Sequence, residues 1–437
     1  MKKVSLLVLS FALVMSVAIA GCSNDRASSD GGKEDSEKEI ELTWWVDARE
    51  DVQSIYEEIK EGFEEQNPNI TINMVVTPDD NVHEKISIAA NTGELPDVQQ
   101  GSFFWPLSYV SSDLLVPLDE LIDEDDIDEG ILNSVSVDDE TFIYPNSTVA
   151  IGLLVNKDLF EEKGALDLLP KNMEPWTFDQ FMEAAKAVTD PESQTYGYGL
   201  FAGDTGGDQA HHAMLWGFGA QTWSDDNQEA ILNSAEGVEG LQFFVDMVDE
   251  GVVPPGAATN RATNLLNDMF IQGNLGMIFG NVGHVAAVNE AFTSGAAEEF
   301  EIDLVPFPTK DGEDTNTVLF GYGTWIWETG NSVKIEQAKK FVQFLNSKEN
   351  MAKLAEAPSV ITPRSSLAGH YEEGTLQHKT TQLFQYAGNI GLAVPGYTET
   401  RNAFYPEIQA ALNKDKSPQQ ALDDFVEKAN EIIEQSQ

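Results

Sequence analysis

Aromatic side chains stand beside acidic, amide and arginine side chains at several points where the sequence predicts that a strand ends. Trp44, Trp45 and Asp47 lie at the end of the first predicted strand, and residues 100–105 (QGSFFW) follow a later one. An aromatic ring can cover the apolar C–H face of a sugar, while carboxylates, amides and guanidinium groups bond the hydroxyls around its rim. These are the residue types that a binding site for a sugar needs.

The motifs of common catalytic and metal sites are absent. The sequence has no HExxH, GxSxG or P-loop, and no GxGxxG after a predicted strand. His211 and His212 would point about 100° apart on a helix and so seldom share a metal. The acidic stretch 123–129 (DEDDIDE) lacks glycine where a calcium loop requires it. We therefore expect no metal, no cofactor and no enzyme, although 74 Asp and Glu residues leave carboxylate pairs for glycoside hydrolysis open.

The composition is that of a folded and very acidic protein. The chain has 437 residues, with 74 acidic and 25 basic side chains and a formal net charge of −49. This length suggests two to three domain-sized units, and 41% hydrophobic residues suffice for packed cores. Nucleic-acid binding is excluded because neutralising phosphates requires a basic surface. The acidity keeps the protein soluble and fits a saline or alkaline habitat without specifying a ligand.

The N-terminus has the pattern of an export signal. Lys2 and Lys3 precede an apolar run, residues 4–20, which is short for a membrane span and ends in small residues. The run meets the only cysteine in the sequence IAGC, which resembles the bacterial lipoprotein box. In such proteins the signal is cleaved before the cysteine, and the thiol carries a lipid with fatty acids such as palmitate.

We therefore expect a signal peptide at residues 1–21, lipidation at Cys22 and a disordered tether at 22–39, which holds no large apolar residue. This predicts a protein anchored at the extracellular face of the bacterial cell membrane, touching the membrane through its lipid only. An ordinary secretory signal followed by a free thiol is the alternative.

Strand and helix patterns alternate from residue 40. Residues 40–46 (IELTWWV) and 70–76 (ITINMVV) are typical strands, and apolar residues between them step by three and four, as in a helix. A second helix pattern precedes residues 95–98 (LPDV). This β-α-β-α-β order predicts an α/β protein with a doubly wound parallel sheet. Further on, Thr177 and Gln180 form a capping box, and Pro418 is placed to open the last helix.

Several segments match one family in order along the chain. They are residues 63–70 (FEEQNPNI), 95–98, 153–160 (LLVNKDLF), 175–181 (PWTFDQF), 270–283 (FIQGNLGMIFGNVG), 305–308 (VPFP) and 321–323 (GYG). This chain departs from the family's LYYNKDLF motif at Val155, which replaces the tyrosine before the asparagine, and from its TWDEF motif at Phe178, which stands at the tryptophan position. Together the segments resemble the family-1 extracellular solute-binding proteins of bacterial ABC transporters, the sugar binders related to maltose-binding protein.

This resemblance implies a two-lobe periplasmic-binding-protein-like fold, each lobe a doubly wound sheet, joined by hinge crossings. The crossings are expected around residues 144–146, 277–280 and 319–323. The N-lobe would hold residues 40–145 and 279–320, and the C-lobe residues 146–278 and 321–437. Parallel sheets bind ligands at the carboxyl ends of their strands, so two facing edges would form a cleft that closes by hinge motion.

The expected ligand-binding residues lie at strand ends, at the crossings, in the glycine-rich stretch 203–219 and in a late loop. They are Trp44, Trp45, Asp47, Arg49, Gln100, Phe104, Trp105, Tyr144, Asn146, Asp204, Trp216, Trp223, Asn281, His284, Tyr322, Tyr397 and Arg401. Only one of the two adjacent tryptophans is expected to reach the cleft, because neighbours on a strand point to opposite faces. Core or hinge packing is the alternative for each aromatic residue, and Trp176, Trp325 and Trp327 are expected in the core.

The resemblance implies a monomeric binding protein that captures a carbohydrate, an oligosaccharide by preference, and delivers it to the permease subunits of an ABC importer. A neutral sugar is expected because the acidic body repels anions. A uronate-type sugar stays open if two of the five arginines converge, and so does another solute. A secreted carbohydrate-active enzyme and a cell-surface adhesion protein are the remaining alternatives.

Overall fold

The computed structural model describes residues 39–77, 82–122, 126–127, 129–137, 140–357 and 360–436. The predicted signal peptide, Cys22 and the predicted tether up to residue 38 lie outside the described residues. Within the described part of the chain, no helix combines the length and apolar character needed to span a membrane.

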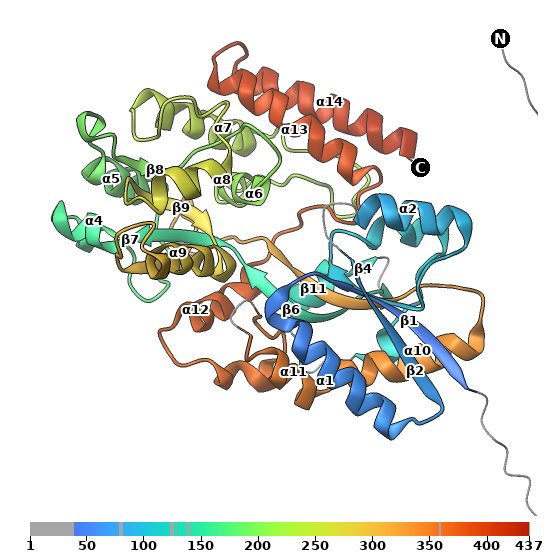
Figure 1. Cartoon of the computed structure of the whole chain (residues 1–437). Coiled ribbons are helices and arrows are strands. Elements are labelled where there is room, and N and C mark those ends of the chain that lie inside the picture. Colours follow the sequence, from blue (N-terminus) through green and yellow to red (C-terminus); the bar gives the residue numbers. More distant parts are fainter. Residues whose placement is uncertain are drawn as a thin grey trace, which may run out of the picture. The chain divides into compact units, whose positions relative to one another are not determined.

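The first sheet has five strands in the order β2-β1-β3-β11-β6. β1 (Ile40–Asp47) pairs in parallel with β2 (Ile70–Thr77) and with β3 (Val98–Ser102). β11 (Leu319–Ile326) runs antiparallel between β3 and β6 (Tyr144–Ala150). The predicted parallel β-α-β-α-β unit is therefore confirmed, and the mixed sheet extends it with two strands (Figure 1). We call this sheet and the helices packed on it the N-lobe.

Helices cover both faces of this sheet because β1 is apolar on both sides. On one face, Trp44 lies wholly buried between Tyr56 of α1 (Glu50–Gln66) and Phe341 of α10 (Ser332–Leu345), with ring centroids 5.3 and 5.0 Å away. On the other face, Lys85 of α2 (Val82–Thr92) lies 3.8 Å from the centre of the Trp45 ring. α11 (Lys348–Leu354) packs on α1 and α10.

The second sheet has four strands in the order β10-β7-β9-β8. They are β7 (Gly152–Asn156), β8 (Tyr196–Tyr198), β9 (Leu275–Gly280) and β10 (Ile302–Val305). β8 and β9 are parallel, while β7 runs antiparallel to both β9 and β10. We call this sheet and its helices the C-lobe.

Helices of very different length belong to the C-lobe. They are α4 (Lys157–Glu162), α5 (Phe178–Val188), α6 (Asp208–Trp216), α7 (Ala235–Asp249), α8 (Ala262–Leu265), α9 (Val282–Ser294), α13 (Tyr397–Leu412) and α14 (Pro418–Ser436). The predicted capping box of Thr177 and Gln180 opens α5. Pro418 is the first residue of α14, as predicted, and Trp176, Trp325 and Trp327 are buried.

The remaining elements are short or lie between the lobes. α12 (Leu376–Leu383) contacts β6 as well as β10. α3 (Glu129–Ser134), β4 (Ser136–Val137) and β5 (Glu140–Thr141) lie between β3 and β6 in the chain. Single turns of 3₁₀ or π helix occur at Leu107–Ser112, Asp119–Leu121, Leu166–Leu168, Pro191–Ser193, Leu266–Phe270, Ser365–His370 and Phe384–Tyr386.

The strand pairing corrects the expected division of the chain. Residues 279–320, expected in the N-lobe, supply β10, which hydrogen-bonds to β7 of the C-lobe sheet. Residues 321–326 of β11 and the whole of α10, expected in the C-lobe, belong to the N-lobe, since β11 inserts between β3 and β6. Both errors concern strands that pair antiparallel with a strand far away in the sequence. The β-α-β pattern predicts only parallel pairing between strands that follow one another.

The crossings move accordingly. Residues 144–146 begin β6, and the chain passes to the other sheet only at residue 151, between β6 and β7. Residues 277–280 lie inside β9, between two strands of the C-lobe sheet, and are no crossing. The chain returns to the first sheet between the end of β10 and the start of β11 at Leu319. The crossing expected at 319–323 was therefore placed too late, because those residues already belong to β11.

Three histidine rings of the C-lobe are withdrawn from solvent: His211 and His212 are buried, and His284 is half-buried. Burial lowers the pKa of His211 and of His212 to about 3, and that of His284 to about 4, from an ordinary 6.5. His211 bonds the Tyr405 hydroxyl and His212 bonds Thr222. In the folded state these rings stay neutral at pH values where the unfolded chain binds protons.

We predict that the free energy of unfolding falls as the pH drops below 6.5, because the unfolded state then binds more protons than the folded state. Each buried histidine should contribute about 1.4 kcal/mol of this loss at pH 5.5. Urea unfolding at pH 7.5 and 5.5 measures it. His211→Asn should reduce the loss by about that amount, whereas His370→Asn, at an exposed position, should not. Equal pH dependence in all three proteins would contradict the argument.

Candidate ligand site between the lobes

The carboxyl ends of β1 and β3 and the beginning of β11 lie at one edge of the N-lobe sheet, and Arg49 is fixed there. Its Nε donates to Asp47 at 2.5 Å, and its Nη2 donates to the Tyr56 hydroxyl at 3.1 Å. Its guanidinium carbon lies 3.9 Å from the centre of the Tyr322 ring. Burial raises the pKa of Asp47, and the charge of Arg49 opposes that rise. The result is a guanidinium group close to an aromatic ring, with its charge compensated by Asp47.

A second arginine is held in the same way on the C-lobe. Arg401, in the second turn of α13, donates through two nitrogens to the buried Asp208 at the start of α6, with 2.8 Å from Nη2 to Oδ1. Nη2 also donates to the Thr205 carbonyl at 2.7 Å. These bonds hold the loop after β8 against the first turns of α13.

Phe104 of the N-lobe lies where the two lobes meet. The loop after β3 carries this half-buried ring, whose centroid lies 6.3 Å from that of Tyr397 and 6.4 Å from that of Phe320. The Arg401 guanidinium carbon lies 5.8 Å from the centre of the same ring. Aromatic residues of both lobes therefore meet at the strand ends, where the fold places its ligand edge.

The hydroxyl of Tyr397 is buried and has no hydrogen-bond partner among the described residues. Burial raises the pKa of this hydroxyl, so it keeps its proton near neutral pH. A buried hydroxyl without a partner is costly unless something else satisfies it. Its place beside Phe104 and Arg401 makes it a candidate hydrogen-bonding group for a ligand.

Six predicted residues lie at this junction in two groups: Arg49 contacts Asp47 and Tyr322, and Phe104 lies near Tyr397 and Arg401. Phe320, near Phe104 and two residues from Tyr322 on β11, links the groups, and we call these seven residues the Phe104 constellation. Asp204 lies in the same loop as Thr205 and Asp208, where it pairs with Arg261 at 3.2 Å. Asn281 and His284 follow β9, with Asn281 capping α9 and His284 5.3 Å from the Phe279 ring. Phe279 in turn packs at the start of α6, against Gly207.

Other predicted residues lie in the interior of the N-lobe, where their side chains bond or pack within the protein. Gln100, Asn146 and Thr324 bond one another in a closed and wholly buried network. The Tyr144 hydroxyl accepts from Arg364 at 2.7 Å. Trp105 packs edge-on against Trp325 and rests on Gly101, where even a Cβ atom would lie 2.0 Å from the indole.

The remaining tryptophans also lie away from the constellation. Trp44 is in the core beneath α1 and α10, and Trp45, on the opposite face, is covered by Lys85. In the C-lobe the Trp216 indole donates to Thr222 at 2.9 Å, and that of Trp223 donates to the Ile390 carbonyl at 3.1 Å. All four side chains are at most 8% exposed, so their bulk is used for packing.

Sequence reasoning missed Asp208 and Phe320. Asp208 is one of 74 acidic residues, and only the pairing of α6 with α13 selects it as the partner of Arg401. Phe320 is two residues before Tyr322 on β11 and so lies on the same strand face. The two-residue spacing from Tyr322 could have identified Phe320 from the sequence, but only if β11 had been predicted to begin at the edge of the cleft.

Every arginine in the described part of the chain forms an ion pair with an aspartate. The pairs are Arg49 with Asp47, Arg261 with Asp204, Arg364 with Asp126, and Arg401 with Asp208. The candidate site therefore holds compensated ion pairs. Among the described residues, no group of three or more His, Cys, Asp or Glu is placed to hold a metal ion.

Known proteins are similar to this chain in sequence and in architecture. The family described as "Bacterial extracellular solute-binding protein" matches residues 47–352. A candidate binding protein of Brucella abortus is 24% identical over 389 residues, covering 86% of this chain and 89% of that protein. The arabinooligosaccharide-binding protein of Bacillus subtilis is 23% identical over 447 residues, covering 97% of this chain and 98% of that protein.

Among solved structures, the cyclic alpha-maltosyl-1,6-maltose binding protein of Arthrobacter globiformis superimposes with a TM-score of 0.76 at 22% identity. The match covers 90% of this chain and 99% of that one. The two-lobe fold implied by the sequence resemblance is thereby confirmed, and the three similar proteins are all named for binding rather than for catalysis. The chain belongs to the bacterial extracellular solute-binding proteins.

Proposed function

We propose that this protein captures a neutral sugar, an oligosaccharide by preference, between its lobes and delivers it unchanged to the permease of an ABC importer. The observation that carries the proposal is the meeting of Phe104 with Tyr397 and Arg401 across the lobes. These groups offer apolar ring faces together with hydrogen-bonding groups, as a pyranose requires. The sugars named for the Bacillus and Arthrobacter relatives support the same ligand class.

The proposed capture of a sugar depends on the distribution of the candidate residues over both lobes. Arg49 and Tyr322 belong to the N-lobe, and Tyr397, Arg401 and Asp208 to the C-lobe, so a ligand that contacts both favours the closed arrangement over the open one. In the structure, Phe104 already fills part of this space against Tyr397. A sugar ring entering between the lobes replaces that contact with two ring–sugar contacts.

The ion pairs argue for a neutral ligand. An anionic sugar would gain most from a guanidinium group with free donors, but Arg49 and Arg401 are each bonded to a buried aspartate. Breaking such a pair leaves an uncompensated buried charge, which costs about 3–5 kcal/mol. A uronate is therefore the weaker candidate, and a carbohydrate-active enzyme has no supporting observation at the site.

The extracellular site of action follows from the family, and we propose that Cys22 provides a lipid anchor there. The acidic body then works at the outer face of the membrane as a monomer, with residues 22–39 as its tether. The partners proposed are the sugar and the permease subunits, and no cofactor is required.

We predict that the wild-type protein binds a neutral oligosaccharide in calorimetry and that Phe104→Ala and Tyr397→Ala each weaken binding about 5- to 100-fold. Loss of one ring–sugar contact costs roughly 1–3 kcal/mol, by analogy with base stacking. Phe300→Leu, which packs with Phe270 and Phe292 elsewhere in the C-lobe, is the control and should bind as wild type. Failure of every sugar in a plant and bacterial panel would refute the proposal, as would turnover of the bound sugar.

We predict that Asp208→Asn shifts selectivity from neutral sugars toward uronate-bearing ones. The substitution removes the carboxylate that compensates Arg401 while keeping a hydrogen-bond acceptor. Calorimetry with a matched pair of neutral and uronate sugars should show the ratio of their affinities changing about tenfold, or 1.4 kcal/mol. Asp126→Asn, which disrupts the Arg364 pair, should leave the ratio unchanged. An equal shift in both variants would contradict a local effect.

We predict that Cys22→Ser releases the protein from the cell into the medium, because no thiol is left to carry the lipid. Fractionation of cells followed by immunoblotting measures the distribution. Ser29→Ala in the same tether is the control and should stay with the membrane. Retention of the Cys22→Ser protein at the membrane would contradict lipidation at this residue.

A further inference from the structure

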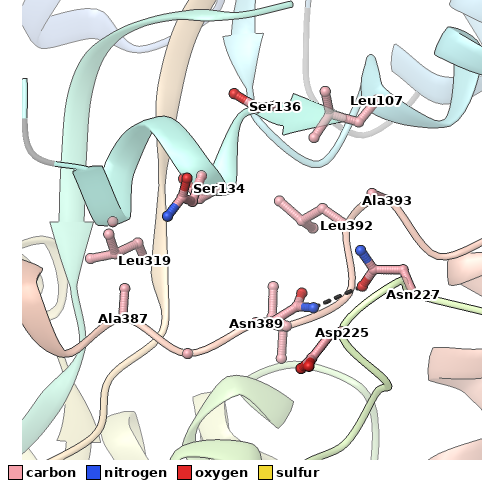
Figure 2. Close-up of a pocket in the computed structure, with 14 residues that line it drawn as sticks. Leu107, Ser134, Ser136, Asp225, Asn227, Leu319, Ala387, Asn389, Leu392 and Ala393 are labelled. Carbon is pink, nitrogen blue, oxygen red and sulfur yellow. Dashed lines mark hydrogen bonds between the residues drawn. The ribbon is translucent and has the colours of Figure 1, made fainter. Parts of the chain in front are cut away.

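A cavity of about 340 Å³ lies between the lobes (Figure 2), and none of the residues that line it belongs to the Phe104 constellation. Leu319, the first residue of β11, lines it. Phe320 and Tyr322, which belong to the constellation, point to the opposite face of the same strand, because successive side chains alternate. The cavity and the candidate sugar site are therefore separated by β11.

Both lobes contribute walls to this cavity. On the N-lobe side, Leu107 and residues of α3 and β4 line it, and Figure 2 shows Leu107 and Ser136 there. On the C-lobe side, the walls are the loop after Trp223 and the segment 387–393, which leads into α13. The Asn389 side chain donates to Asn227 at 2.7 Å, which ties these two C-lobe segments together.

Two tryptophans fix the shape of the C-lobe wall. The Trp216 ring lies on Gly388 and the Trp223 ring on Gly391, where a Cβ atom would come within 2.3 and 2.2 Å of the respective indoles. Both indole N–H groups are bonded within the lobe. A second cavity of about 250 Å³ lies beside these rings and shares Asp225, Gly388 and Asn389 with the first, so the two are adjacent.

The lining is apolar at its base and polar at its rim. The buried side chains are Leu107, Leu319, Ile390 and Leu392. Exposed amide and carboxylate groups surround them, from Asn133, Asp225 and Asn389. Among the described residues that line the cavity there is no lysine or arginine to compensate an anion.

We propose that this cavity is a second binding site, for a small neutral polyol of monosaccharide size. Its volume is at the lower end of the range for ligand sites, about 300–1,000 Å³. Its apolar base fits the C–H face of such a molecule, and the rim amides fit its hydroxyls. The site does not depend on the proposed sugar capture, because it shares no residue with the Phe104 constellation.

Ligand-observed saturation-transfer NMR tests the site, with glucose, xylose and glycerol as probes. The background is Tyr397→Ala, which weakens the candidate sugar site and replaces no residue that lines the cavity. We expect saturation transfer to at least one probe in this background. When Ala393→Trp fills the cavity, the signal of that probe should fall fivefold or more. Asn389→Leu, which removes a rim amide, should weaken the signal in the same direction and serves if Ala393→Trp does not fold.

Absence of transfer to all three probes in the Tyr397→Ala protein would overturn the second site. So would a signal that neither folded cavity variant reduces. Ala393→Trp in the wild-type background should still bind the oligosaccharide, as measured by calorimetry. A failure of the second site is therefore distinguishable from a failure of sugar capture, which calorimetry on the wild-type protein reports separately.

Discussion

The buried pairing of scarce arginines with aspartates is the interaction on which the candidate site depends. Asp47 and Asp208 are both at most 1% exposed, and each would be a costly buried charge without its arginine. The pairs hold Arg49 flat against Tyr322 and Arg401 beside Phe104. Each lobe thus presents a rigid, electrically neutral surface at its strand ends, in a chain whose overall charge is −49.

The fold explains why these surfaces face each other. β1 and β3 end at one edge of the N-lobe sheet, and β11, arriving from the C-lobe, starts at that same edge. The chain crosses between the sheets directly after β6, beside β11. Two crossings that lie side by side make a natural hinge, and the rings of Phe104 and Tyr397 meet in front of it.

Local patterns allowed much of the fold to be predicted from the sequence. The parallel β1–β2–β3 unit, the capping box of α5 and the start of α14 follow from periodicity and capping residues, which act over a few positions. The lobe membership of β10 and β11 did not follow, because antiparallel pairing with β7 and β3 is decided by tertiary contacts. The resemblance to a family carried the two-lobe architecture, which periodicity alone does not give.

The residue types of the candidate site could be predicted from the sequence, but the directions in which their side chains point could not. Arg49, Arg401, Phe104 and Tyr397 were identified because rings and polar groups fell at strand ends and in a late loop. Gln100 and Asn146 have the same types and positions, but they are turned toward Thr324 in the interior. Which face a side chain takes depends on the neighbouring strand, and Asp208 was indistinguishable from the other acidic residues until α6 and α13 were seen together.

A crystal structure with the oligosaccharide that binds most tightly in calorimetry tests the central claim most directly. The account predicts a sugar ring between Phe104 and the Tyr397–Arg401 side of the cleft, with the Tyr397 hydroxyl bonded to the sugar and both Asp–Arg pairs intact. Density for the sugar at any place that leaves Phe104 and Tyr397 in contact with each other would contradict it.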